Sequence, residues 1–108
     1  MSTTLIATRN VSDRLRGFLA SSLLEVGPGI YFGARLSPAV RDRIWSVVEG
    51  AWGSETEASV VMVWRDQKLP CEHAVKTLGT PPVSLVEHDG IILTHRHAAE
   101  PPGKPAIP

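Results

Sequence analysis

The segment from residue 60 to residue 64 constrains the fold of this chain more than any other. It consists of Val-Val-Met-Val-Trp, a run of apolar residues in which valine dominates. Because successive side chains of a strand point to opposite faces, a run without a polar position is expected to be buried on both faces. Residues 4–8 form a second run with apolar neighbours on both faces. We therefore predict two interior strands, with residues 60–64 at the centre of a sheet.

An amphipathic helix is predicted to follow the first strand. It would begin at Asn10, a good cap residue, with Asp13 three positions later where a carboxylate reaches back to the cap. Its apolar positions repeat at three- and four-residue intervals. They are Val11, Leu15, Phe18, Leu19, Leu23 and Val26. The helix is expected to end near Val26, because Gly27-Pro28-Gly29 follows.

A second helix is predicted to begin at Ser37 and Pro38, a cap followed by a first-turn proline, and to end near Gly53. Its apolar stripe consists of Val40, Ile44, Val47, Val48 and Ala51. Three weaker strand signals complete the pattern, the last of them after an Asp89-Gly90 turn. They lie at residues 30–32, 72–78 and 91–93.

This order of strands and helices predicts an α+β ferredoxin-like sandwich, with two helices on one face of a four- to five-stranded sheet. Two helices about 10 Å wide cover one face of four strands spaced about 4.8 Å apart, and no more. The other face would expose apolar residues of both interior strands, and exposed apolar patches of that extent mark interfaces. We therefore expect a symmetric homodimer formed through the open face.

The length of 108 residues is that of one domain. We expect the ferredoxin-like domain at residues 1–97 and a flexible tail at residues 98–108, which hold four of the nine prolines. No apolar run reaches the roughly 18 residues of a membrane span and no signal peptide is visible, so we expect a cytoplasmic protein without membrane contact. Cys71 is the only cysteine, which excludes an internal disulfide and a zinc site built from thiolates alone.

The charges are balanced overall but divided along the chain. Eleven basic and eleven acidic residues cancel, yet residues 1–48 hold six arginines against three acids. Arg14 and Arg16 are expected on opposite sides of the first helix's apolar stripe, with Arg9 and the positive helix N-terminus beside them. Arg41 and Arg43, preceded by Arg35, would extend the same basic surface. This arrangement predicts phosphate binding; ordinary solvated arginines are the alternative.

Other candidate residues carry weaker signals. His95 and His97 would share a strand face, with His88 and Asp89 nearby, but two ligands do not make a metal site, and a solvated strand end is the simpler interpretation. Cys71 and His73 lack the third group that would orient a nucleophile and its base. Trp45 and Trp52 lie seven residues apart on one helix, where base stacking is possible and packing at the core edge is commoner.

Several motifs resemble CRISPR-associated protein 2 of the type I-E subfamily, over about residues 5 to 95. The most specific is Arg14-Leu15-Arg16-Gly17, within a match that extends from Thr8 to Gly17. The remaining matches follow in the family's order and spacing. They are Leu23-Leu24-Glu25-Val26, Gly29-Ile30-Tyr31-Phe32-Gly33, Ser37 with Arg41-Asp42-Arg43-Ile44-Trp45, Val61-Met62-Val63-Trp64 and Asp89-Gly90-Ile91-Ile92-Leu93.

The resemblance implies a scaffold in antiviral defence, in which a ferredoxin-like homodimer bridges two dimers of the integrase, CRISPR-associated protein 1, during spacer acquisition. In that family, basic residues at the positions of Arg14 and Arg16 touch the backbone of duplex DNA, and the C-terminal segment docks on the integrase. No cofactor is needed for this role. We therefore expect a DNA-binding scaffold with no catalytic residue and no bound metal, whose nucleic-acid contacts come from Arg9, Arg14, Arg16, Arg41 and Arg43.

The family is also described as a magnesium-dependent endoribonuclease, with some members cutting double-stranded DNA. That hydrolase activity is assigned to an acidic residue ending the first strand, paired across the dimer. Arg9 occupies this position here, and a guanidinium cannot bind a cation. Asp13 is the nearest acid, and Ser12-Asp13 stands where relatives often have two prolines. A metal-dependent nuclease is therefore the alternative function, and a small metabolite-binding module is a third.

Overall fold

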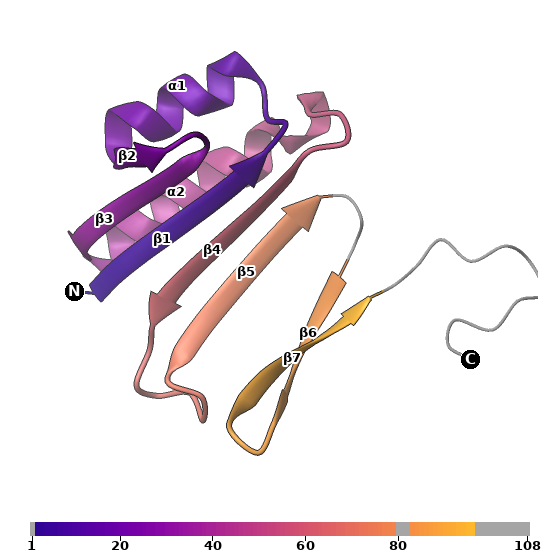
Figure 1. Cartoon of the computed structure of the whole chain (residues 1–108). Helices are drawn as coiled ribbons and strands as arrows, with labels where there is room; N and C mark the ends of the chain where they lie inside the picture. The colour runs from indigo at the N-terminus through magenta and orange to yellow at the C-terminus, as the bar shows by residue number, and fades with distance from the viewer. Residues whose placement is uncertain (1, 80–82, 97–108) are drawn as a thin grey trace, which may run out of the picture.

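The computed structural model describes residues 2–79 and 83–96 (Figure 1). The predicted tail at residues 98–108 and His97 lie outside the described residues. Within them the chain forms seven strands, two α-helices and one 3₁₀ turn. In chain order these are β1 (Ser2–Arg9), α1 (Asp13–Ser22), β2 (Leu24–Gly27), β3 (Ile30–Leu36), α2 (Pro38–Ala51), the 3₁₀ turn (Trp52–Ser54), β4 (Ser59–Arg65), β5 (His73–Gly79), β6 (Val83–His88) and β7 (Ile91–Arg96).

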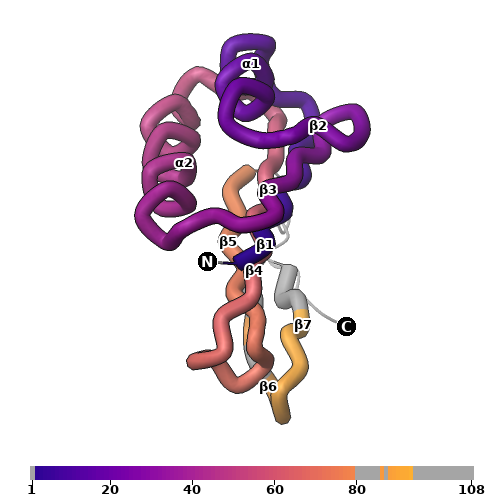
Figure 2. Tube along the Cα trace, turned by 90° about the vertical axis from the view of Figure 1, so that its left-hand side faces the viewer, coloured from indigo at the N-terminus to yellow at the C-terminus, as the bar shows by residue number. Residues whose placement is uncertain are grey.

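Five strands form one antiparallel sheet in the order β2-β3-β1-β4-β5. Apart from the 3₁₀ turn, the elements from β1 to β4 follow the order strand, helix, strand, strand, helix, strand, and the two helices cover one side of the sheet (Figures 1 and 2). The predicted α+β ferredoxin-like sandwich is confirmed, with five strands in the main sheet. The central strand is β1, however, and not β4, which contains residues 60–64. Strands β3 and β2 lie on one side of β1, and β4 and β5 lie on the other.

The core lies between the helices and one face of the sheet. Leu15 and Leu19 of α1 and Ile44 and Val48 of α2 are buried there against strand residues. The strand residues of this cluster are Ile6, Tyr31, Val60, Met62 and Trp64. Burial alternates along β4, so the prediction that residues 60–64 are buried on both faces is wrong for one protomer. Their side chains on the open face are only half-buried.

Helix α1 begins two residues later than predicted. Its cap is Ser12, whose hydroxyl accepts the Leu15 N–H at 3.3 Å. Asn10 instead adopts a positive φ of 59°, and its side-chain amide donates to the carbonyls of Thr56 and Glu57. Asparagine tolerates this conformation better than most residues. Asn10 thus fixes the loop before β4, and Asp13 is the first helical residue rather than a capping partner.

The end of α1 also differs from the prediction. The helix stops at Ser22, and Leu24 to Gly27 form β2, the edge strand that was not predicted. Leu24 pairs with Phe32 in register, and Val26, expected in the helical stripe, is 56% exposed. Residues 28 and 29 connect β2 to β3, where Gly29 has a φ of +74° and a side chain would collide with Thr8.

Helix α2 confirms its predicted signals. The Ser37 hydroxyl accepts the Val40 N–H at 3.2 Å, Pro38 is the first helical residue, and a 3₁₀ turn finishes the helix at Ser54. Ile44 and Val48 of the predicted stripe are buried together with Trp45. Val40 and Val47, also assigned to the stripe, are 41% and 40% exposed and lie at its margin.

The second face of the sheet carries no helix in the described part of the chain. Residues that pair directly across antiparallel strands share a face, so the register defines its rows. One row crosses all five strands through Leu24, Phe32, Leu5, Val63 and Val75, and the next contains Ile30, Ala7, Val61 and Thr77. We call these two rows the open face. Leu24 is 65% exposed, and Leu5 and Ile30 are each 38% exposed.

Strands β6 and β7 form a separate two-stranded hairpin. Asp89 and Gly90 both have positive φ, at 53° and 81°, as the predicted tight turn requires. The predicted strand at residues 91–93 is therefore part of β7, while its partner β6 was not predicted. No helix among the described residues is long and apolar enough to cross a membrane.

Candidate nucleic-acid interface

Arg14 and Arg16 lie on α1, on opposite sides of its buried stripe, as the helical spacing predicted. Both side chains are exposed. Arg14 borders a groove of about 370 Å³ between α1 and α2, together with Phe18, Val47 and Gly50. Within residues 2–79 and 83–96 it forms no ion pair, so its guanidinium is available to an external anion.

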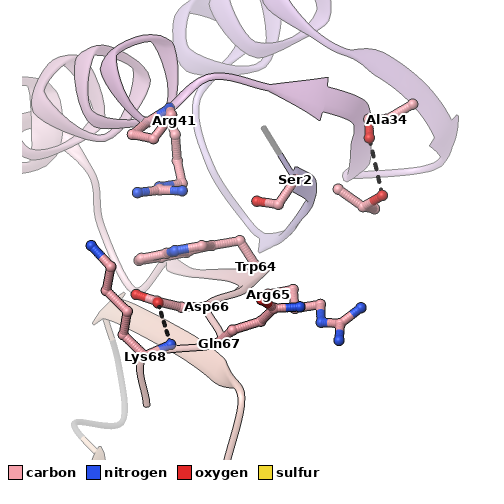
Figure 3. A pocket seen from close by; sticks show the side chains of 10 residues that line it. Ser2, Ala34, Arg41, Trp64, Arg65, Asp66, Gln67 and Lys68 are labelled. Atoms are coloured by element: carbon pink, nitrogen blue, oxygen red, sulfur yellow. Dashed lines mark hydrogen bonds between the residues drawn. The ribbon is translucent and has the colours of Figure 1, made fainter.

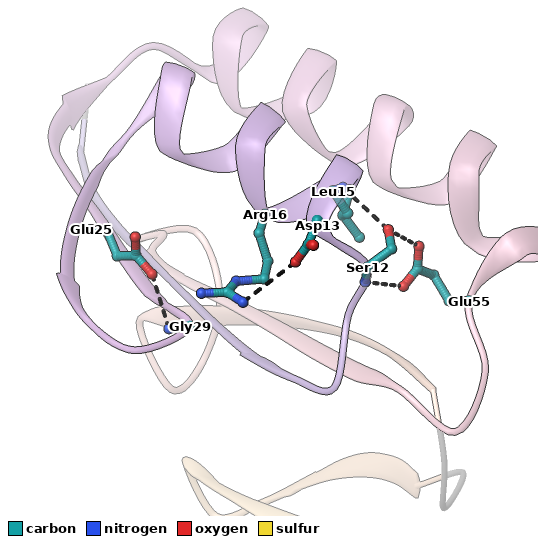
Figure 4. Close-up of polar contacts among 7 residues, drawn as sticks. All are labelled: Ser12, Asp13, Leu15, Arg16, Glu25, Gly29 and Glu55. Carbon is teal, nitrogen blue, oxygen red and sulfur yellow. Dashed lines mark hydrogen bonds and ion pairs between the residues drawn. The ribbon is translucent and has the colours of Figure 1, made fainter.

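Arg16 has acidic neighbours on the other side of α1, with Asp13 next to its guanidinium (Figure 4). Its Nη1 lies 3.6 Å from Asp13 Oδ1, in an ion pair that leaves the Arg16 side chain 52% exposed. Surface pairs of this kind contribute at most about 1 kcal/mol and exchange readily with other anions. The pair therefore does not prevent Arg16 from contacting a phosphate.

Tyr31 lies beneath Arg16 and is completely buried. Burial is the main cause that raises the pKa of its phenol above 10.0; the Glu25 carboxylate also raises it, and the Arg16 cation acts in the opposite direction. The Tyr31 hydroxyl makes no hydrogen bond of good geometry among the described residues, although Arg16 and Glu25 lie near enough to affect it. Arg16 thus approaches the core edge as well as solvent. Sequence patterning placed Tyr31 on a strand but gave no sign of this contact.

Arg9 ends β1 close to the N-terminus of α1. Its Nε–H donates to Ser59 Oγ at 3.4 Å, and the side chain is exposed. Arg9 and Ser59 are direct partners in the β1–β4 register, on the same side of the sheet as Leu5 and Ala7. The structure therefore places Arg9 at the end of β1 just before α1, as the sequence predicted, and adds that its side of the strand is the open face.

Arg41 and Arg43 lie at the other end of the molecule. Helix α2 starts near the beginning of β1, where Ser2 pairs with Leu36, whereas α1 starts after β1 has ended. The prediction that these arginines extend the surface of Arg14 and Arg16 is therefore wrong, since the two helices begin at opposite ends of β1, about 20 Å apart along the strand. Arg43 is exposed, as is Arg35 before it. The Arg41 guanidinium stacks on the Trp64 ring, 4.2 Å from its centroid.

The N-terminus of α1 already holds an anion of the protein itself. Glu55 accepts the Ser12 N–H and the Ser12 hydroxyl proton, each at 2.7 Å (Figure 4). A carboxylate there satisfies a backbone donor and complements the helix dipole. A phosphate at this helix end would compete with Glu55, so the arginine side chains, rather than the helix N-terminus, are the better anion contacts. Glu55 lies 43 positions from Ser12, and no local sequence signal connects the two.

The residues at the end of β1 do not fit a magnesium site within one protomer. Magnesium requires hard oxygen ligands, and Arg9 stands where the resemblance implied an acid. Of the nearby carboxylates, Glu55 is bonded to Ser12 and Asp13 pairs with Arg16. Among the described residues no three His, Cys, Asp or Glu side chains converge on one point.

The remaining candidate residues gain no support as sites within the described part of the chain. His88 Nε2 lies 3.4 Å from Asp89 Oδ2 at the exposed hairpin turn, and His95 lies on β7 opposite Ser84. The Cys71 thiol donates to the His73 carbonyl, while the His73 ring contacts the Cys71 carbonyl, so thiol and imidazole do not pair.

The two helix tryptophans behave as the commoner interpretation predicted. Trp45 is buried in the core, and Trp52 packs against its edge. A ring that packs against the core has little surface left on which a base could stack. Trp45 and Trp52 are therefore structural, and base stacking by them finds no support.

Comparison with known families agrees with this geometry. A family model described as CRISPR-associated protein (Cas_Cas2CT1978) matches residues 3–93. The match includes β1 through β5 with both helices, and most of the β6–β7 hairpin. The chain therefore belongs to the CRISPR-associated protein (Cas_Cas2CT1978) family and is a Cas2-like protein of CRISPR systems.

Proposed function

We propose that this protein is a scaffold subunit of the CRISPR spacer-acquisition complex, of the type I-E subfamily. It forms a homodimer, bridges two dimers of the integrase subunit, CRISPR-associated protein 1, and holds duplex DNA by its backbone. Family membership supports the role in CRISPR systems. The type I-E assignment rests on the Arg14-Leu15-Arg16-Gly17 motif and the matches around it.

The open face is the observation that carries the proposal. One of its rows is apolar across all five strands, and no described helix covers it. Leaving such a surface in water is costly at roughly 25 cal/mol per Å² of apolar area. A second copy of the chain offers a matching face, because a two-fold axis brings the same patch of both subunits together. The helices of both copies then lie on the outside of the dimer.

The DNA contacts are assigned to Arg14 and Arg16, with Arg9 near them. Guanidinium groups bind phosphate oxygens through paired charge-assisted hydrogen bonds, and such contacts hold a duplex without reading its sequence. The two side chains emerge on either side of α1, which would allow one helix to contact two points of a phosphate backbone. Binding that does not depend on sequence suits a subunit that must accept any captured DNA.

The β6–β7 hairpin is the proposed docking element for the integrase. An isolated two-stranded hairpin is marginally stable in water. This one also presents large apolar side chains to solvent, with Val86 47%, Ile91 59% and Leu93 48% exposed. Val86 and Leu93 are direct partners in the register and therefore share a face. Contact with a partner protein would bury that face.

The decisive experiment replaces Arg14 and Arg16 together by Glu in the complex with the integrase. Spacer integration should be lost, while sedimentation should still report a dimer. A matched control is Arg35→Glu, which changes an equally exposed arginine at the end of β3 and should leave integration intact. The affinity of the wild-type complex for a duplex should fall as the salt concentration rises. A plot of the logarithm of the association constant against the logarithm of the salt concentration should have a slope of about −0.9 per phosphate neutralised. Full integration by the double variant would contradict the proposal.

The same preparations test the nuclease alternative. Purified protein that cuts RNA or DNA with Mg²⁺, and stops when a chelator is added, would favour the enzyme over the scaffold. Asp13→Asn should then reduce the activity, because Asp13 is the carboxylate nearest to Arg9 in sequence. We expect the wild-type protein to cleave no more substrate than the Asp13→Asn variant does.

A further inference from the structure

A groove of about 740 Å³ opens at the end of the sheet farthest from Arg9 and Arg14 (Figure 3). Its walls are the first turn of α2, the start of β1, and the end of β4 with the loop that follows. Its lining residues include Ser2, Thr3, Arg41, Trp64, Gln67 and Lys68. The volume lies within the range of small-molecule sites. Neither the family assignment nor the proposed scaffold role gives this groove a function.

Arg41 is the unusual residue of the groove. Its side chain is only 12% exposed, and the guanidinium lies over the Trp64 ring. The Nε–H is buried without a hydrogen-bond partner, and the nearest carboxylate oxygen, Asp42 Oδ1, is 3.8 Å away. A mostly buried cation normally has an anionic partner or several acceptors, because burial otherwise costs several kcal/mol. Within the described part of the chain, Arg41 has the aromatic ring and one long ion pair with the exposed Asp42 side chain, and its Nε–H has no acceptor within hydrogen-bond distance.

Two more cations surround the same ring. The Lys76 ammonium lies 5.9 Å from the Trp64 centroid, and Lys68 lines the groove. In Figure 3 the end of the Lys68 side chain and the Arg41 guanidinium extend to the same side of the Trp64 ring, whereas Arg65 extends the opposite way. Arg65 forms an exposed ion pair with Glu72 and, because it extends the opposite way, is not part of this group of cations.

The only acid in the groove lining does not neutralise these cations. Asp66 Oδ1 accepts the backbone N–H of Lys68 at 3.0 Å, which holds the loop after β4 in shape. Arg41 and Lys68 at the groove, with Lys76 nearby, therefore face one carboxylate that is already hydrogen-bonded. The groove is a positively charged cavity with an aromatic floor and the hydroxyls of Ser2 and Thr3 at its rim. Thr3 donates to the Ala34 carbonyl at 3.0 Å.

From this arrangement we infer that the groove binds a terminal phosphate, carried by a mononucleotide or by the end of a nucleic-acid strand. A terminal phosphate carries nearly two negative charges and three acceptor oxygens, which match a guanidinium fork and a nearby ammonium. A single carboxylate would satisfy Arg41 but leave Lys68 unpaired and most of the cavity empty. The site is separate from Arg14 and Arg16, about 20 Å away along β1, and does not depend on their role.

The test is a titration of the full-length protein followed by NMR of the Arg41 Nε–H and the Trp64 indole N–H. Adenosine 5′-monophosphate should shift both signals to saturation, and adenosine, which lacks the phosphate, should not. A hexathymidylate with a 5′-phosphate, compared with the same strand without it, distinguishes a strand end from a free nucleotide. Equal shifts with adenosine, or no shift with either phosphorylated probe, would overturn the inference.

Variants then assign the binding to the groove. Arg41→Lys keeps the charge but loses the fork, and should weaken nucleotide binding about tenfold or more. Lys68→Gln changes an exposed loop residue, so the fold should persist while binding weakens several-fold. Arg43→Gln, on α2 but outside the groove lining, is the matched control and should bind as the wild type does. If Lys68→Gln binds as tightly as Arg43→Gln, the phosphate does not sit in this groove.

Discussion

Replacing Leu5 by Asp tests whether the open face forms a dimer. Leu5 lies at the centre of the row that crosses all five strands and is 38% exposed in one protomer. Complete burial of a leucine side chain contributes about 2–3 kcal/mol, so burying the remaining 38% contributes about 1 kcal/mol per copy. Introducing an unpaired carboxylate adds a desolvation penalty of several kcal/mol for each ion. Two copies together should weaken the dimer by more than about 5 kcal/mol, which is over a thousandfold in the dissociation constant.

The protomer itself should remain folded in this variant. The neighbours Thr4 and Ile6 face the helices and carry the core contacts, while Leu5 points away from them. Val40→Asp is the matched control, because Val40 is 41% exposed but lies on α2, on the helical side of the sheet. Sedimentation equilibrium should show dimers for the wild type and Val40→Asp and monomers for Leu5→Asp. A monomeric wild type, or a Leu5→Asp dimer as tight as the control, would refute the reasoning.

Two further predictions concern stability. Glu55→Gln leaves one of the two Ser12 donors with an uncharged acceptor and the other facing an amide NH2 that cannot accept, so urea denaturation should show a loss of about 1–2 kcal/mol that the exposed control Glu49→Gln lacks; equal losses would contradict it. Tyr31→Phe should change stability little at neutral pH, because the buried hydroxyl has no partner. The folded-state pKa of Tyr31 is raised above 10.0, because the folded protein favours the neutral phenol. Its contribution to the free energy of unfolding is therefore complete below pH 10.0 and is lost as the pH rises through the folded-state pKa. Above pH 10.0 the free energy of unfolding should therefore fall more steeply with pH for the wild type than for Tyr31→Phe. Equal slopes would show that burial of the phenol does not change its pKa.

The sequence was sufficient for the elements whose signals are local. Ser37 and Pro38 mark the start of α2 with their own side chains, and Asp89 and Gly90 supply the positive φ values that the hairpin turn requires. The ferredoxin-like order followed from these signals and from the apolar run at residues 60–64. Each depends on chemistry within a few residues, which is what periodicity and capping rules describe.

The start and end of α1 were not predictable in this way. An apolar residue at position 23 fits the end of a helical stripe and also the start of an edge strand. The hydrophobic pattern there does not distinguish helix from strand. The choice is made by Phe32, which pairs with Leu24 across the turn at Gly29. Asn10 and Ser12 are both good caps, and the decision depends on Thr56, Glu57 and Glu55, more than 40 positions away.

In the candidate site, too, local features were predictable and features that depend on the sheet topology were not. Helical spacing placed Arg14 and Arg16 on two sides of α1, because both belong to one element. It grouped Arg41 with them because both helices begin with arginines, and only the sheet topology separates their ends. The contact between Arg41 and Trp64 joins an early turn of α2 to the end of β4, and its signal in the sequence is limited to an unremarkable arginine and a strand-ending tryptophan.

Arg9 connects dimerisation to the loss of a metal site. It shares the open side of the sheet with Leu5 and Ala7, so the proposed pairing of two open faces would bring both Arg9 side chains toward the rim of the interface. A metal shared across the dimer would need carboxylates at that rim, and two guanidinium groups repel a divalent cation instead. Arg9 also ends β1 just before α1 starts at Asp13, where the proposed DNA contacts begin. Arg9 thus opposes metal-dependent cleavage and favours phosphate binding at one position, which is the combination that a noncatalytic scaffold requires.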